Sequence, residues 1–78
     1  MSTKAFVLIE TAVGKTRDVV QALEGTDGIK SVDVVTGPYD IIAVVEADNL
    51  EGIGEAVTSQ VHTVPGIVRT VSCLSVSI

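Results

Sequence analysis

The chain has 78 residues, which is enough for one domain covering residues 1–78 and too few for two. Its net charge of −5, with the five basic residues scattered along the chain, argues against direct binding of nucleic acid by this chain. A domain of this size buries only roughly 60% of its unfolded surface, yet 46% of its residues are hydrophobic, so we expect its thin core to be reinforced by assembly.

The first half of the chain predicts a strand, a helix and a turn. Lys4–Glu10 is rich in β-branched and aromatic residues and predicts a buried strand. Gly14–Glu24 switches to a helical period, and Gly25–Gly28 supplies residues that end a helix and make a turn. One face of this helix is expected to carry Thr16, Val19, Val20 and Leu23, at helical spacing.

Two further strands, Ile29–Val35 and Ile41–Ala47, flank a short loop that contains Gly and Pro and predicts a β-hairpin. Asp48 offers a cap for the next helix, and Glu51 three residues later completes a pattern like a capping box. The apolar stripe of that helix contains Leu50, Ile53, Val57 and Val61.

Val64–Gly66 ends the second helix, and Ile67–Ile78 predicts a long last strand. The order βαββαβ is that of the ferredoxin-like α+β fold, with a four-stranded antiparallel sheet and two helices on one face. The runs Phe6–Ile9 and Ile41–Val45 are apolar at consecutive positions, so both faces of these strands require burial. We therefore expect a homodimer whose sheets pack face to face, an assembly like the dimeric α/β barrels.

The last strand supports the same expectation. Its twelve residues would reach about 40 Å at ~3.3 Å per residue, which exceeds the needs of a small sheet. Its end should therefore pair or pack on another subunit.

Several residues look like sites and are better explained by structure. Gly14-Lys15-Thr16 resembles the tail of a phosphate-binding loop, but Ile9 stands where the pattern needs its first Gly, so Gly14 is expected to cap a helix. His62, the only histidine, suits a solvated helix end. Cys73, the only cysteine, is expected to be a small buried hydrophobe in a strand. We expect no metal, no cofactor and no catalytic residue.

The chain also has no recognisable targeting or membrane segment. The apolar run Phe6–Ile9 is only four residues long before Glu10, which is too short for a signal peptide. Nothing approaches the ~20 apolar residues that a membrane helix needs. A cytoplasmic location is the expectation.

Tyr39 and Asp40 in the hairpin loop are the strongest candidates for a binding role, because a turn itself requires neither. In a purely structural role, Tyr39 packs its ring on a neighbouring subunit and Asp40 accepts hydrogen bonds from turn amides. In a binding role, loop amides receive the carboxylate of a small zwitterion and Asp40 receives its ammonium group. The bare backbone of Gly37 would allow the ligand a close approach.

Three segments together resemble the effector-binding (RAM) domain of the Lrp/AsnC family of regulators: Ala5–Thr11 followed by Gly14-Lys15, Val34–Asp40, and Val64–Thr70. The resemblance covers essentially the whole chain and implies a stand-alone module, since family regulators carry a helix-turn-helix before this domain. The resemblance implies that amino acids bind in clefts between subunits and that dimers assemble into a ring. It leaves open whether the chain acts alone or co-assembles with full-length Lrp/AsnC regulators.

The resemblance implies a ligand site at Gly37, Tyr39 and Asp40, joined by Thr70 and Ser72 on one face of the last strand. Pro38 departs from the family pattern, because it fills a position that is often polar and lacks a backbone donor. The sequence leaves two alternatives open: a small dimeric enzyme of the monooxygenase or isomerase kind, and a regulatory domain of the ACT type. The Gly-x-Tyr-Asp hairpin favours the Lrp/AsnC family.

Overall fold

The computed structural model describes residues 2–76. It contains four strands and two helical segments in the predicted order βαββαβ. The elements are β1 (Thr3–Thr11), α1 (Thr16–Leu23), β2 (Ile29–Val34), β3 (Ile41–Ala47), α2 (Leu50–Ala56) with a π-helical continuation η1 (Val57–Val61), and β4 (Ile67–Leu74).

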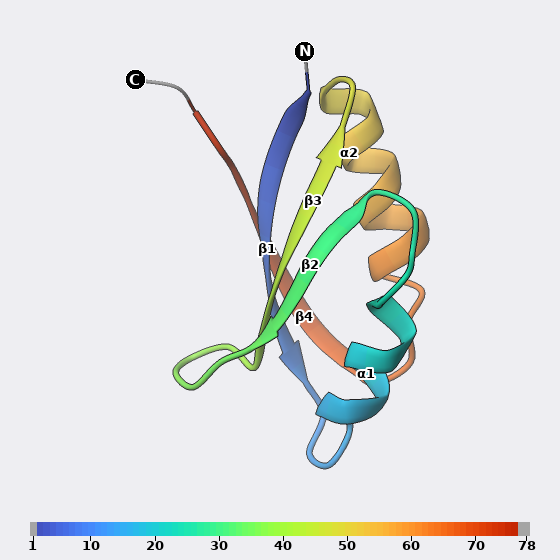
Figure 1. Ribbon diagram of the computed structural model, residues 1–78. Helices are drawn as coiled ribbons and strands as arrows, with labels where there is room; N and C mark the ends of the chain where they lie inside the picture. Colours follow the sequence, from blue (N-terminus) through green and yellow to red (C-terminus); the bar gives the residue numbers. More distant parts are fainter. Residues whose placement is uncertain (1, 77–78) are drawn as a thin grey trace.

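The strands form one antiparallel sheet in the order β2-β3-β1-β4, and the helices lie together on one of its faces (Figure 1). The expected ferredoxin-like architecture is therefore confirmed. The two central strands are β3 and β1, and β2 and β4 are the edges. The β2–β3 hairpin projects from the end of the sheet at which β1 also finishes.

The core lies between the sheet and the helices because alternate residues of the central strands point to that side. Ala5, Val7 and Ile9 of β1 are fully buried, and so are the three β3 residues that pair with them. The helices contribute the other side of the core. Its helical members are Val19, Leu23, Ile53, Val57 and Val61.

Two predicted helix caps were wrong by one residue. Lys15, not Gly14, precedes α1, and Gly14 instead has a φ of +79° in the turn that leads to the helix. Asn49, not Asp48, caps α2, because its side chain accepts a hydrogen bond from the Gly52 amide. Asp and Asn are equally good capping residues, so adjacent candidates give no way to choose from the sequence.

The last strand ends earlier than predicted. β4 stops at Leu74, and the backbone of residues 75 and 76 is not in a strand. Residues 77 and 78, the end of the predicted Ile67–Ile78 strand, lie outside the described residues. Cys73 is exposed, contrary to the prediction of a buried residue, because it sits on an edge strand opposite Phe6 on the face without helices.

The second face of the sheet carries no helix, yet its centre is apolar. Phe6 is 38% exposed on β1, and Val71 is 38% exposed on β4. Leu8 of β1 and Ile42 and Val44 of β3 share this face and are half-buried. We call these five residues and Cys73 the open face. Its composition agrees with the expectation that both faces of the central strands require burial.

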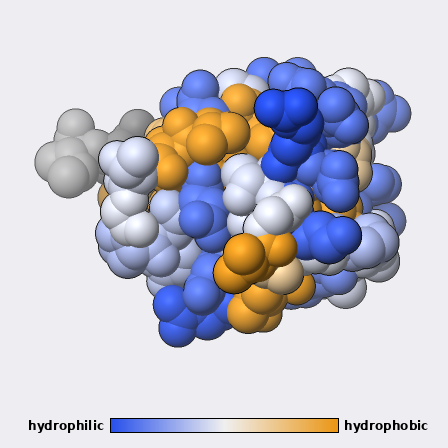
Figure 2. Space-filling view, turned by 90° about the horizontal axis from the view of Figure 1, so that it is seen from below, coloured by the Kyte–Doolittle hydropathy of each residue, from blue (hydrophilic) through white to orange (hydrophobic). Residues whose placement is uncertain are grey.

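Apolar side chains also reach the surface elsewhere. At the end of the molecule seen from below, hydrophobic patches interrupt a largely polar surface (Figure 2). In the part of the chain that the structure describes, no helix has the length and apolar character needed to cross a membrane.

Candidate functional site

The hairpin loop, residues 35–40, docks on the end of β1 through backbone hydrogen bonds. The Val35 amide donates to the Asp40 carbonyl at 2.9 Å and closes the loop. The Asp40 amide donates to the Ile9 carbonyl, also at 2.9 Å, and fixes the loop to β1. Between these anchors Gly37 is exposed, has a φ of +140°, and has open space where a Cβ would lie. The backbone at Gly37 is therefore open on the side where a Cβ would lie.

The loop offers donors without partners. Within residues 2–76, the amides of Gly37 and Tyr39 donate to no acceptor, and Pro38 between them has no N–H. Both amides are therefore available to donate hydrogen bonds to an acceptor from outside the chain.

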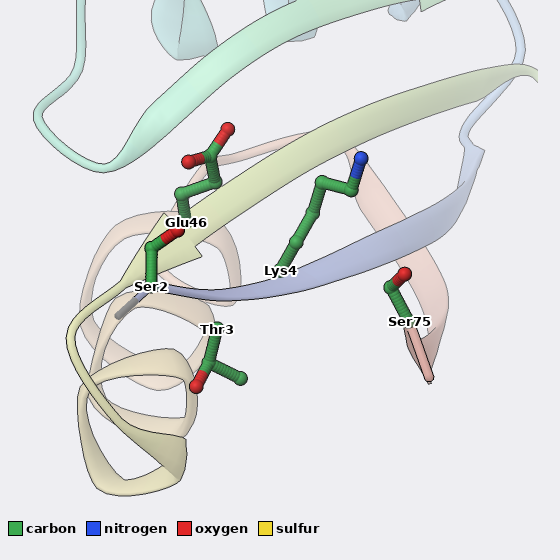
Figure 3. Close-up of a pocket in the computed structure, with 5 residues that line it drawn as sticks. All are labelled: Ser2, Thr3, Lys4, Glu46 and Ser75. Atoms are coloured by element: carbon green, nitrogen blue, oxygen red, sulfur yellow. The ribbon is translucent and has the colours of Figure 1, made fainter. Parts of the chain in front are cut away.

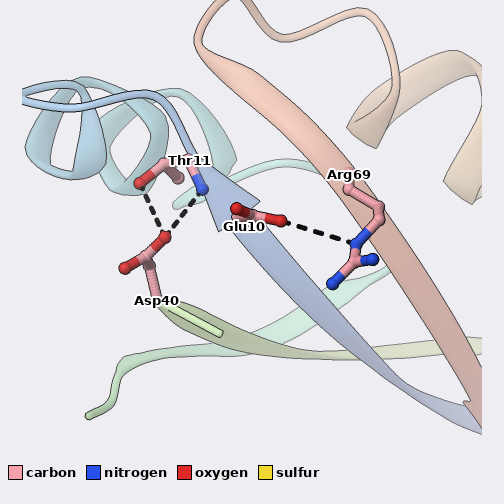
Figure 4. A network of polar contacts seen from close by, with 4 residues as sticks. All are labelled: Glu10, Thr11, Asp40 and Arg69. Atoms are coloured by element: carbon pink, nitrogen blue, oxygen red, sulfur yellow. Dashed lines mark hydrogen bonds and ion pairs between the residues drawn. The ribbon is translucent and has the colours of Figure 1, made fainter. Parts of the chain in front are cut away.

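The carboxylate of Asp40 ties the loop to Thr11 at the end of β1 (Figure 4). Its Oδ2 accepts from the Thr11 amide at 2.8 Å and lies 3.2 Å from the Thr11 hydroxyl, which donates to it. The hydroxyls of Thr11 and Thr16 are 2.8 Å apart and share a hydrogen bond. Asp40 thus has a structural role, although its partner is an amide of β1 rather than one of the turn.

Tyr39 is held by a neighbour from the same chain. The guanidinium of Arg69 lies over the Tyr39 ring, with Cζ 5.5 Å from the ring centroid. Arg69 is directly opposite Glu10 in the β1–β4 pairing, and its Nε lies 3.4 Å from Glu10 Oε1 (Figure 4). Glu10, Arg69 and Tyr39 therefore form one cluster beside the loop.

An apolar hollow of about 430 Å³ lies under the loop, beside Tyr39. Four of its six lining residues are aliphatic, and Leu8 and Ile42 among them also belong to the open face. The full lining is Leu8, Val35, Thr36, Pro38, Tyr39 and Ile42. A hollow of this size lies within the range of ~300–1,000 Å³ that is usual for small-molecule sites.

The two residues of the last strand that were predicted to join the site, Thr70 and Ser72, lie away from the hairpin loop. Thr70 and Ser72 pair with Ile9 and Val7, so they share the helix side of the sheet with these core residues. The Thr70 hydroxyl is 2.9 Å from Nε2 of His62, and Ser72 is exposed. They occupy one face of β4, as predicted, but the cluster around Tyr39 is on the other face.

The five predicted site residues therefore fall into two groups within one chain. Gly37, Tyr39 and Asp40 gather at the hairpin loop, and Thr70 and Ser72 gather on the helix side of β4. One chain does not bring the groups into a single pocket.

A second hollow, of about 380 Å³, lies at the opposite end of β1 and is polar (Figure 3). Lys4 and Glu46 face each other across the β1–β3 pairing there. Their charged ends diverge in Figure 3, and the Lys4 ammonium lies 5.4 Å from the centroid of the Phe6 ring. Residues 2–76 hold no group of three or more His, Cys, Asp or Glu side chains placed to bind a metal.

Four further residues organise the loop and were not predicted from the sequence: Glu10, Thr11, Thr16 and Arg69. Their roles depend on strand register, which places Arg69 opposite Glu10 and brings Thr11 to Asp40 across 29 residues. The sequence marks this end of the first strand only by the change from the apolar run Phe6–Ile9 to Glu10 and Thr11.

Comparison with known proteins identifies relatives over the whole domain. Residues 4–78 match the family model described as the Lrp/AsnC ligand binding domain. The chain is 32% identical, over 78 residues, to an uncharacterized HTH-type transcriptional regulator of Pyrococcus furiosus. That match covers 96% of this chain and 52% of the relative, so the chain spans about half the length of the curated relatives it matches.

Solved structures of other proteins have the same fold over nearly the whole chain. The crystal structure of a hypothetical protein from Pyrococcus horikoshii superposes with a TM-score of 0.88 at 33% identity, covering 100% of this chain and 93% of that one. A transcriptional regulator from Neisseria meningitidis, solved as a complex with L-Met, has the same fold with a TM-score of 0.85 at 13% identity. That superposition covers 96% of this chain and 50% of the regulator.

Proposed function

Because the chain belongs to the Lrp/AsnC ligand-binding domain family, a family of regulatory effector-binding modules, we propose that it binds an amino acid or a similar small zwitterion between copies of itself. The observation that carries the ligand part of this proposal is the pair of open amides at Gly37 and Tyr39, beside a carboxylate and an apolar hollow.

The open face supports assembly. It is apolar at its centre, and both helices of the described residues pack on the other face of the sheet. A large apolar patch on a soluble domain marks an interaction surface. A second copy would bury the patch sheet against sheet, and such dimers would assemble further into a ring.

Assembly also explains the division of the predicted site. Gly37, Tyr39 and Asp40 belong to one side of the molecule, whereas Thr70 and Ser72 belong to the other side of β4. A cleft that uses both groups needs two copies of the chain, one supplying the loop and the other supplying the strand.

The polar groups of the loop suit a zwitterion. The amides of Gly37 and Tyr39 are free to receive a carboxylate, and Asp40 uses only Oδ2 for Thr11, which leaves Oδ1 for an ammonium group. The complex of the Neisseria meningitidis regulator with L-Met supports an amino acid as the class of ligand.

The relatives' description as HTH-type transcriptional regulators supports a role in transcription or amino-acid metabolism. We propose that this chain acts through mixed assembly with full-length Lrp/AsnC regulators, in the cytoplasm, and not by binding DNA itself, because its own charge is −5. The same relatives favour a regulatory module over an enzyme, and the family match favours the Lrp/AsnC type over the ACT type.

The proposal is tested by a thermal-shift screen of the pure protein against the twenty amino acids, with light scattering to report mass. At least one amino acid should raise the melting temperature, because a ligand that binds the native state stabilises it. A stable monomer at micromolar concentration that responds to none of them would contradict both parts of the proposal.

A further inference from the structure

Arg69 is placed to do more than form a surface ion pair. An arginine side chain has five N–H donors, and the contact with Glu10 involves only Nε, at 3.4 Å. The side chain is 61% exposed, so its terminal amino groups remain accessible. The Tyr39 ring beneath it fixes the plane of the guanidinium beside the hairpin loop.

The surroundings of this cation are asymmetric. On the loop side, the open amides of Gly37 and Tyr39 add partial positive charge. Beside the Tyr39 ring, the hollow of about 430 Å³ is lined mainly by aliphatic side chains. Glu10 offsets part of the charge of Arg69 through the contact at Nε, but the exposed terminal amino groups of Arg69 remain hydrogen-bond donors near the apolar hollow. This combination matches a molecule with a carboxylate at one end and an aliphatic tail at the other.

We propose that Arg69 is the carboxylate-binding residue of this site and that the hollow beside Tyr39 selects ligands with an aliphatic tail. This inference rests on the proposed function, because it concerns the same loop. It names the ligand chemistry more narrowly: a small aliphatic carboxylate, either an amino acid or the corresponding acid without the amino group.

The geometry assigns complementary tasks to the polar groups. A guanidinium binds a carboxylate through two parallel N–H donors, which a neutral amide pair supplements but does not replace. Asp40 Oδ1 is the acceptor for an ammonium group when the ligand has one. Leu8 and Ile42 line the hollow and also belong to the open face, so the copy packed on that face would close the hollow.

The experiment is isothermal titration calorimetry of the whole chain with four probes: L-leucine, isocaproate, isoamylamine and L-glutamine. The first three share a branched tail and carry both charges, only the carboxylate, or only the ammonium group. L-glutamine keeps both charges but has a polar tail. We expect L-leucine and isocaproate to bind, isoamylamine not to bind, and L-glutamine to bind at least tenfold more weakly than L-leucine.

Arg69→Gln removes the charge and keeps much of the side chain's length. It should weaken the binding of L-leucine and of isocaproate at least tenfold, because it removes the charged donors that would hold the carboxylate. Its melting temperature should fall by a few degrees at most, because an exposed ion pair contributes little to stability. Arg17→Gln, the same change at an exposed residue of α1, is the matched control and should alter neither affinity.

Val35→Thr tests the hollow. Threonine has nearly the shape of valine but adds a hydroxyl. This variant should therefore lower the affinity for L-leucine and reduce the ratio of the affinities for L-leucine and L-glutamine. If the unsubstituted protein binds L-glutamine more tightly than L-leucine, the hollow does not select aliphatic tails and its assignment is wrong.

The outcomes separate this inference from the proposed function. If L-leucine binds and Arg69→Gln leaves its affinity unchanged, the role of Arg69 is wrong while the proposed function stands. If none of the twenty amino acids binds but isocaproate binds in an Arg69-dependent way, the role of Arg69 stands and the amino-acid proposal fails. If none of the amino acids and none of the probes binds, both are wrong.

Discussion

Asp40 is the residue whose structural and binding roles can be separated by a single pair of substitutions. Its carboxylate accepts two hydrogen bonds from Thr11, and the loop that it anchors carries the open amides of Gly37 and Tyr39. Asp40→Ala removes Oδ2, which accepts both hydrogen bonds, and leaves the Thr11 amide without a partner. Asp40→Asn removes the charge but keeps an oxygen that the Thr11 amide can reach.

The expected stability changes follow from these contacts. A hydrogen bond to a charged group contributes ~1.5–3 kcal/mol and a neutral one ~1 kcal/mol. We expect Asp40→Ala to lower the free energy of unfolding by about 2–3 kcal/mol and Asp40→Asn by about 1 kcal/mol. For a domain of this size, 1 kcal/mol corresponds to about 4–8 °C in melting temperature, so thermal unfolding resolves the two variants.

The expected affinities follow a different order. If Asp40 also receives the ligand's ammonium group, Asp40→Asn should weaken amino-acid binding about tenfold to a hundredfold despite its small effect on stability. Isothermal titration calorimetry below both melting temperatures measures this. Asp27→Asn, in the exposed turn after α1, is the matched control and should change neither quantity. An Asp40→Asn variant that binds the ligand as tightly as the parent would refute the binding role and leave only the structural one.

Three other predictions concern assembly, the cap of α2 and DNA. Val44→Glu places a charge at the centre of the open face and should give smaller particles in light scattering; an unchanged mass would show that copies meet elsewhere. Asn49→Ala should cost ~1 kcal/mol in thermal unfolding, whereas Asp48→Ala should cost nothing measurable, and the reverse order would contradict the observed cap. The pure chain should not retard duplex DNA in a gel-shift assay, and salt-sensitive retention would contradict this.

The type and order of the elements could be predicted from the sequence because each element has its own local residue pattern. The helical spacing of Val19 and Leu23, the apolar runs of the central strands and the glycine-rich turns specify element type and order independently. The errors lie at boundaries where neighbouring residues are equivalent. Asp48 and Asn49 are equally good caps, and the end of β4 depends on whether a neighbour is present, since an edge strand can extend only as far as it is paired.

The site was readable only in part. Gly37, Tyr39 and Asp40 stand out in the sequence because the turn itself requires neither the phenol nor the carboxylate. The contact of Arg69 with Tyr39 and that of Asp40 with Thr11 join residues 30 and 29 positions apart. Such contacts depend on the register of β1 with β3 and β4, which hydrophobic pattern alone does not fix to the single residue.

The most direct test of the central claim, that this chain binds an amino acid between its copies, is a calorimetric titration of the wild-type protein with each of the twenty amino acids. We expect saturable binding of at least one of them, and we expect the binding heat to disappear when Val44→Glu separates the copies. Saturable binding that is unchanged in a monomeric Val44→Glu protein would contradict a site between copies, and no binding by any amino acid would contradict the claim altogether.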